Sequence, residues 1–210
     1  MRTGDVDDAR APGAKGREDN YTPAGSSNRS SSAEKPKTIR AVIFDIGGVM
    51  VGLKYGRLYK YVLYGANALH RAIMRKEDDA DNYARLYVST RKFNDGMLEI
   101  IGELKAAGYK LPVLSNATHE NIHANRRFGT YDHFHPHPLI LSADVGLDKP
   151  DRRIFELAAR RIGLRPEQCV FVDDKKRNVD AARQVGFNAI VFKNAKQLRK
   201  DLKKHGVKIG

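Results

Sequence analysis

The chain has 210 residues, 41% of them hydrophobic, which suffices for one domain of ordinary size with room for a small insertion. No run approaches the roughly 18 apolar residues of a membrane-spanning helix, and the polar start lacks the apolar region of a signal peptide, so we expect no membrane contact. The single cysteine, Cys169, excludes an internal disulfide and lies in an apolar run, which predicts a buried, inert thiol in a cytoplasmic protein.

The net charge of +13 lies almost wholly outside the first 38 residues. Residues 1–38 hold seven basic and six acidic side chains and few large apolar ones, a composition typical of a disordered tail. The rest of the chain has 31 basic and 19 acidic residues, which attract phosphate groups, and a small phosphorylated substrate is the partner we expect. A solvated basic surface explains the charge equally well. Nucleic acid is the lesser alternative, because the basic residues are scattered and no aromatic RNA-binding signature is present.

The first predicted element is a buried strand over the apolar run Ala41–Phe44, which ends in a single carboxylate, Asp45. Gly47 and Gly48 then turn the chain and leave backbone amides open to an anion. Open α/β sheets place their chemistry at the carboxyl ends of parallel strands. Asp45 is therefore a candidate nucleophile, because a carboxylate can attack phosphorus and form an aspartyl-phosphate. The alternative is a solvated aspartate at a strand end.

Residues 53–94 follow a mostly helical pattern, with a second helical piece near 80–92, and they interrupt the chain directly after the first strand. We interpret this segment as a small inserted cap. Its basic residues are consistent with an anionic ligand; they are Lys54, Arg57, Lys60, Arg71 and Arg75.

Downstream of the cap, predicted strands alternate with predicted helices. We expect strands at 111–114, 139–141, 170–172 and 189–192, and helices over 95–108, from 118, and over 151–162, 178–185 and 195–205. Such alternation implies parallel pairing with right-handed crossovers, so the predicted fold is an α/β, doubly wound, Rossmann-like parallel sheet. Its expected parts are the tail 1–38, a core formed by 39–52 and 95–210, and the cap 53–94.

Two later segments add groups that suit phosphate chemistry. Ser115 and Asn116 end the second strand, where a hydroxyl and the following amides can hold phosphate oxygens; helix N-capping is the alternative. Lys149 lies just before a helix, and Pro150 fixes the backbone there. A cation at this place neutralises carboxylates and an incoming phosphate. An exposed loop lysine is the alternative interpretation.

Asp173 and Asp174 end the strand that contains Cys169. Two adjacent carboxylates repel each other, so a cation is expected beside them. Oxygen ligands together with a substrate phosphate favour Mg²⁺ over zinc. Asn178, one helical turn further on, is placed to orient these carboxylates.

The order of the four segments resembles that of the haloacid dehalogenase superfamily of phosphohydrolases over residues 39–205. The similarity lies in Leu114–Ala117, Gly146–Asp151 and Val172–Val179, together with the first strand. The branch of sugar-phosphate phosphatases and of the N-terminal phosphatase domain of epoxide hydrolases is most similar, because it carries a small helical cap after the first motif. The resemblance implies a Mg²⁺-dependent phosphatase that hydrolyses a small phosphorylated metabolite through an aspartyl-phosphate.

The resemblance also implies roles for the individual residues. The metal would be held by Asp45, the Gly47 carbonyl and Asp173, with Asp174 one shell further out. Lys149 would steady both charges. The phosphate would be bound by Ser115, Asn116, Gly47, Gly48 and Lys149.

Gly47 departs from the pattern, because most phosphatases of this superfamily have a second Asp there as general acid and base. Glycine offers its carbonyl to a metal but cannot protonate a leaving oxygen, a task worth about 10²–10⁴-fold in rate. One alternative is therefore a catalytically impaired module that binds phosphate or a partner. A dehalogenase-type hydrolase is another, although dehalogenases lack the paired metal carboxylates that Asp173 and Asp174 provide here.

Three histidines alternate at His133, His135 and His137, which raises the question of a metal site. Two intervening prolines and the absence of a nearby cysteine favour a surface loop instead.

Overall fold

The computed structural model describes residues 38–54 and 79–210. Almost all of the predicted tail lies outside these residues, and so does the middle of the predicted cap with Arg57, Lys60, Arg71 and Arg75.

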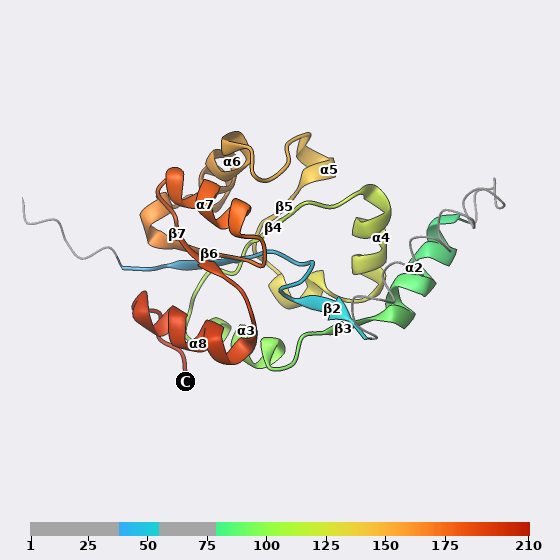
Figure 1. Ribbon diagram of the computed structural model, residues 1–210, viewed down its shortest axis with the longest axis horizontal. Helices are drawn as coiled ribbons and strands as arrows, with labels where there is room; N and C mark the ends of the chain where they lie inside the picture. Colours follow the sequence, from blue (N-terminus) through green and yellow to red (C-terminus); the bar gives the residue numbers. More distant parts are fainter. Residues whose placement is uncertain (1–37, 55–78) are drawn as a thin grey trace, which may run out of the picture. The chain divides into compact units, whose positions relative to one another are not determined.

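Five parallel strands form the central sheet in the order β5-β4-β1-β6-β7 (Figure 1). Their bounds are β1 Ala41–Phe44, β4 Val113–Ser115, β5 Leu139–Leu141, β6 Cys169–Asp173 and β7 Asn188–Val191. The all-apolar β1 takes the middle position, where both of its faces are covered. Phe44 lies opposite Val113 on one side and Val172 on the other, so Asp45 after β1, Ser115 at the end of β4 and Asp173 at the end of β6 lie at one edge of the sheet.

Helices cover both faces of the sheet (Figure 1). One face carries α3 Met97–Ala106 and α8 Ala195–Lys204, and the other carries α6 Arg152–Ile162 and α7 Lys176–Gln184. The side chains of β1 alternate between the two layers: Val42 and Phe44 belong to one buried cluster, Ala41 and Ile43 to the other. The predicted doubly wound α/β sheet is confirmed.

The structure departs from the expected elements in a few places. Two three-residue strands, β2 Val51–Leu53 and β3 Arg91–Phe93, pair antiparallel. Neither was predicted, and β3 lies where the sequence indicated helix, because strands this short produce no recognisable periodicity. The second strand begins at Val113 rather than at 111, since Pro112 has no N–H to donate to a neighbouring strand. In the described part of the predicted cap, the helical pattern corresponds to α2 Asp79–Thr90.

Two tyrosines attach α2 to the core helix α4, which spans His119–Arg127. The Tyr83 hydroxyl donates to Asn121 Oδ1 at 2.6 Å, and the Tyr87 hydroxyl donates to Asn125 Oδ1 at 3.1 Å. Each pair is one helical turn from the other on both helices, so the two bonds fix the register in which α2 packs on α4.

The histidine-rich segment passes through a 3-10 helix, η1 Tyr131–Phe134, and the turn after it. His133 packs edge-on against Phe93, with 5.1 Å between the ring centres. Among the described residues, these histidines are not part of a group of three or more potential metal ligands. No helix in the same part of the chain is long and apolar enough to cross a membrane.

Cys169 is fully buried at the start of β6, and burial raises the pKa of its thiol to about 12. Because only the thiolate is nucleophilic, we expect no reaction of the folded protein with a disulfide reagent at mildly alkaline pH. Complete reaction is expected once the protein is unfolded in urea. A spectrophotometric thiol titration in both states measures this, and rapid labelling of the folded protein would contradict the burial.

Candidate active site

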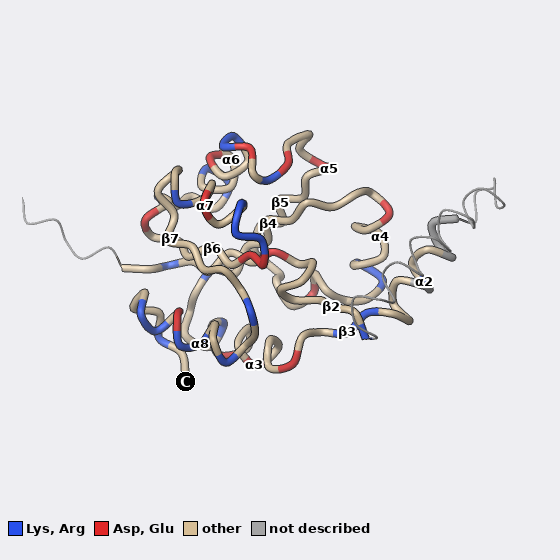
Figure 2. Tube along the Cα trace, viewed as in Figure 1, with Lys and Arg blue, Asp and Glu red and all other residues tan. Residues whose placement is uncertain are grey.

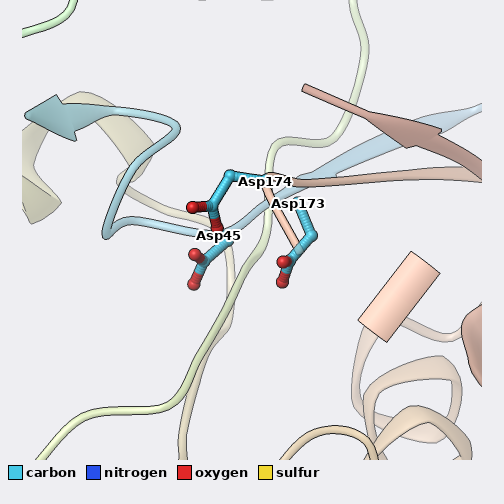
Figure 3. Close-up of side chains that lie close together, drawn as sticks. All are labelled: Asp45, Asp173 and Asp174. Carbon is cyan, nitrogen blue, oxygen red and sulfur yellow. The ribbon is translucent and has the colours of Figure 1, made fainter. Parts of the chain in front are cut away.

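Asp45, Asp173 and Asp174 come together where β1 and β6 end side by side (Figure 3). Parallel pairing of Phe44 with Val172 sets this arrangement, because it brings the residues that follow both strands to the same level. Figure 2 shows the acidic residues here next to the basic stretch 175–177. The sequence-predicted carboxylates thus form one cluster.

Lys149 connects the loop before α6 to this cluster. Its Nζ donates to Asp45 Oδ1 at 2.8 Å, to Asp173 Oδ2 at 2.7 Å and to the carbonyl of Leu114 at 2.8 Å. The residue is only 3% exposed, so these contacts are shielded from water. Three acceptors use all three N–H groups of the ammonium, which fixes its position between the two carboxylates. The exposed-loop interpretation of Lys149 does not hold.

Asn116 acts on Lys149 through the backbone. Its Nδ2 donates to the Lys149 carbonyl at 2.9 Å, and its Oδ1 accepts from the Lys149 N–H at 2.8 Å. This reciprocal pair joins the loop after β4 to the loop before α6. This pair uses one of the two N–H groups of Nδ2, so the predicted phosphate contact of Asn116 can come from the second side-chain N–H or from the backbone N–H.

Ser115 and Asp45 are both buried, at 4% and 5% exposure. Burial raises the pKa of Asp45, while the Lys149 ammonium and a hydrogen bond with Ser115 lower it and the negative charge of Asp173 raises it. Lys149 and Ser115 thus favour the carboxylate form that a nucleophile needs.

The two adjacent aspartates have different surroundings. Asp173 is fully buried, and its oxygens accept from Lys149 Nζ, from the Lys175 N–H and twice from Asn178 Nδ2. Asp174 is exposed, and its carboxylate lies toward that of Asp45 (Figure 3). Asp174, rather than Asp173, therefore presents an exposed carboxylate beside Asp45.

The two glycines after Asp45 also differ. Gly48 has φ +90°, which favours glycine, and a Cβ added there would lie 2.5 Å from Asp174 Oδ2, so the Asp174 carboxylate would have to move. Around Gly47 an added Cβ meets no atom within 4 Å. The space beside Gly47 would therefore accept a side chain.

The cluster suits a divalent cation. One oxygen from each of Asp45, Asp173 and Asp174 lies within 4.8 Å of the others. Among the described residues, Lys149 forms the ion pairs with Asp45 and Asp173, and the charge of Lys175 acts on Asp174. Burial raises the pKa of Asp174, and the charges of Asp45 and Asp173 raise it further, which reflects surplus negative charge. Hard oxygen donors with a net charge of about −2 match Mg²⁺.

Some parts of the site were not predicted from the sequence. The Leu114 carbonyl and the Lys175 N–H are backbone groups with no residue-specific signal. Asn94 contacts the loop after Asp45 from 46 residues away, and no local pattern indicates that pairing.

Replacing Lys149 by methionine is expected to destabilise the fold by about 3–5 kcal/mol near neutral pH, because two buried carboxylates lose their cation. Burial already raises the pKa of Asp45, and removal of Lys149 raises it further. As the pH falls through this raised pKa, Asp45 takes up a proton in the folded variant and the deficit shrinks. Urea unfolding without divalent cations, at neutral and at mildly acidic pH, measures both effects.

The matched control is Lys176→Met. Lys176 pairs with Asp180 on the surface of α7, and its side chain is 76% exposed, so its loss should cost less than about 1 kcal/mol. An equally small cost for Lys149→Met, or a deficit that grows on acidification, would contradict the role of Lys149.

Comparison with known proteins identifies the family to which the chain is similar. Residues 54–186, more than half of the chain, match the family model described as haloacid dehalogenase-like hydrolase. A glyceraldehyde 3-phosphate phosphatase of Methanothermobacter thermautotrophicus is 37% identical over 91 residues, which are 42% of this chain and 39% of the relative. An (S)-2-haloacid dehalogenase of Burkholderia cepacia is 33% identical over 92 residues, covering 44% and 39%. A chloroplast flavin mononucleotide hydrolase of Arabidopsis thaliana is 25% identical over 136 residues, covering 64% and 54%.

The chain thus spans about half or less of the length of these curated relatives. Solved structures show the same fold at low identity. A phosphatase of Thermococcus onnurineus has a TM-score of 0.59 at 20% identity, covering 78% of this chain and 98% of its own. An enzyme of Bacteroides thetaiotaomicron, in complex with magnesium and inorganic phosphate, has a TM-score of 0.56 at 20% identity, covering 74% and 94%.

Proposed function

The chain belongs to the haloacid dehalogenase-like hydrolases, and from this premise we propose that it is a Mg²⁺-dependent phosphatase acting on a small phosphorylated metabolite. The observation that supports this most is the buried network in which Lys149 joins Asp45 to Asp173, with Asp174 beside it. A dehalogenation at carbon needs no metal carboxylates, so the three clustered aspartates favour phosphate chemistry. The phosphatases among the relatives agree with this choice.

In the proposed reaction, an Asp45 carboxylate oxygen attacks phosphorus, and the bond from phosphorus to the ester oxygen breaks. The product of this step is an aspartyl-phosphate on Asp45. Water then attacks that phosphorus, releases inorganic phosphate and restores the carboxylate. Lys149 favours the ionised form of Asp45 that attacks in the first step, stabilises the carboxylate that departs in the second, and offers positive charge to the transferring group.

The remaining residues of the site bind the phosphate and the metal and orient the reacting groups. The hydroxyl of Ser115 and the backbone N–H of Asn116 would hold phosphate oxygens, whereas the Ala117 N–H already donates to Ser142 Oγ at 3.0 Å. Asp45, Asp174 and the Gly47 carbonyl would hold Mg²⁺, while Asp173 fixes Lys149. The two aspartates thereby exchange the roles that the family resemblance implies for them. The ion, when bound, neutralises the carboxylates and the phosphate.

The leaving oxygen needs a proton, and Gly47 has no side chain to donate one. In this proposal solvent supplies it, which makes leaving-group basicity the main limit on rate. This feature also supports the second candidate, a module that binds Mg²⁺ and phosphate without turnover.

Hydrolysis of p-nitrophenyl phosphate with Mg²⁺ and with excess chelator tests the proposal. The phosphatase predicts turnover that the chelator abolishes and that added Mg²⁺ restores. The binding module predicts Mg²⁺-dependent phosphate affinity with no hydrolysis of this or of any ester in a broad panel.

We also propose that the core comprises 39–52 and 95–210 and that 53–94 is an inserted cap. The antiparallel pair of β2 and β3 supports these limits, because Leu53 pairs with Arg91 and the Lys54 N–H donates to the Thr90 carbonyl at 2.9 Å. The chain thus leaves the core and returns to it at neighbouring points.

A further inference from the structure

Asn94 binds the loop that follows the proposed nucleophile. Its Nδ2 donates to the carbonyls of Gly48, at 3.0 Å, and Val49, at 2.8 Å. Its backbone N–H donates to the Met50 carbonyl at 2.9 Å. One half-buried residue at the end of the proposed cap therefore ties three consecutive carbonyls of this loop.

This loop carries the groups that the site needs in fixed places. The Gly48 N–H donates to the Val51 carbonyl at 2.9 Å, and the loop leads into β2 (Figure 3). Gly48 lies close to Asp174, because a Cβ added to Gly48 would lie 2.5 Å from Asp174 Oδ2. A shift of the loop would therefore move Gly48 relative to Asp174, and the Gly47 carbonyl relative to Asp45.

Gly52, on β2, faces the other polar atom of Asn94. A Cβ added at Gly52 would overlap Asn94 Oδ1. Asn94 is thus held on one side by the carbonyls that it binds and on the other by the backbone of β2, so its position is set within narrow limits.

We propose that Asn94 is a positioning residue for the metal site: it holds the Gly47–Gly48 loop where the Gly47 carbonyl and the Asp45 and Asp174 carboxylates can bind one Mg²⁺ together. The proposal rests on the proposed function, because it assumes that this site binds Mg²⁺. It adds a link between the end of the cap and the metal site, through a side chain that touches neither metal nor substrate.

Asn188 provides a matched control. Its Nδ2 also donates to two backbone carbonyls, those of Glu167 at 2.9 Å and Cys169 at 3.3 Å, and the residue is likewise half-buried. It lies at the start of β7, whereas Asp45 follows the end of β1, so the two asparagines are at opposite ends of the parallel strands. Truncation of either asparagine removes the same kind of bonds.

The experiment is calorimetric titration of Mg²⁺ into the full-length protein, its Asn94→Ala variant and its Asn188→Ala variant, with urea unfolding of each. We expect Asn94→Ala to weaken Mg²⁺ binding by about 10-fold or more, as residues that orient metal ligands do. Asn188→Ala should leave Mg²⁺ affinity within about twofold of wild type, although both variants lose similar stability.

A second variant guards against a folding failure. Gly52→Ala keeps Asn94 but displaces it, so it should also weaken Mg²⁺ binding, and adding it to Asn94→Ala should cause little further loss. Equal Mg²⁺ affinities of wild type, Asn94→Ala and Gly52→Ala would overturn the role of Asn94 alone. A wild-type protein that neither binds Mg²⁺ nor hydrolyses phosphate esters would overturn the proposed function and this inference with it.

Discussion

Replacement of Asp45 by asparagine is expected to lower phosphatase turnover by about 10⁴-fold or more, because the amide cannot attack phosphorus. The same change should leave the domain as stable as before at neutral pH, or more so. Burial raises the pKa of Asp45, so its charged form is disfavoured in the folded state above that pKa, and a neutral amide removes this cost. Turnover of p-nitrophenyl phosphate with Mg²⁺, together with urea unfolding, measures both effects.

Asp201→Asn is the control for this change. Asp201 pairs with Lys204 on the surface of α8, away from the strand ends that carry the site. We expect full turnover from this variant and a small loss of stability at neutral pH. An Asp45→Asn variant that is equally active would remove Asp45 as the nucleophile.

Replacement of Gly47 by aspartate is expected to raise turnover on alkyl and sugar phosphates by up to about 10²–10⁴-fold. Their departing oxygens need a proton, whereas p-nitrophenolate leaves readily without one, so the gain on the nitrophenyl ester should be small. The structure allows this substitution, because no atom lies within 4 Å of an added Cβ and φ lies outside the left-handed region. Parallel assays on a sugar phosphate and on the nitrophenyl ester, with a Mg²⁺ titration, measure the effect.

Gly102→Asp adds the same charge on α3, at another glycine with open space around its Cβ position, and should change neither assay. Equal effects of Gly47→Asp on both esters would mean that another group already protonates the leaving oxygen. Loss of Mg²⁺ binding by Gly47→Asp would mean that glycine is needed there for its backbone.

The sequence predicted the sheet and the position of its polar edge because both depend on local patterns. An apolar run that ends in Asp45, and another that ends in Asp173, each indicate a buried strand with a carboxylate at its end. Parallel pairing then brings both ends to one edge. The loop lysine, Lys149, could be placed at the same edge through the order of the elements alone.

What each polar side chain contacts depends on pairings between distant residues. Asn116 and Lys149 are 33 residues apart, and Lys149 and Asp45 are 104 apart, so no local spacing reports these bonds. Which of Asp173 and Asp174 faces Lys149 follows from the direction of each side chain at the end of β6. Asp173 is buried with Asn178 and Lys149 inside the fold, and its neighbour is left exposed.

The two glycines after Asp45 also show that contacts between distant residues could not be predicted from the sequence. The sequence indicated a turn at Gly47 and Gly48 but not that only Gly48 is sterically required. That difference arises from Asp174, which approaches Gly48 across the paired strands. A side chain at Gly48 would be strained by its left-handed φ and would meet Asp174, whereas a side chain at Gly47 would have open space.

The central claim is that Asp45 carries the phosphoryl group during turnover, and trapping that intermediate tests it most directly. The protein is mixed with Mg²⁺ and a phosphate ester, quenched in acid within the turnover time, digested and analysed by mass spectrometry. The account predicts one added phosphoryl group on the peptide that contains Asp45, absent when Mg²⁺ is chelated and absent from Asp45→Asn. Hydrolysis that proceeds at full rate with no phosphorylated peptide, or with the phosphoryl group on another residue, would contradict it.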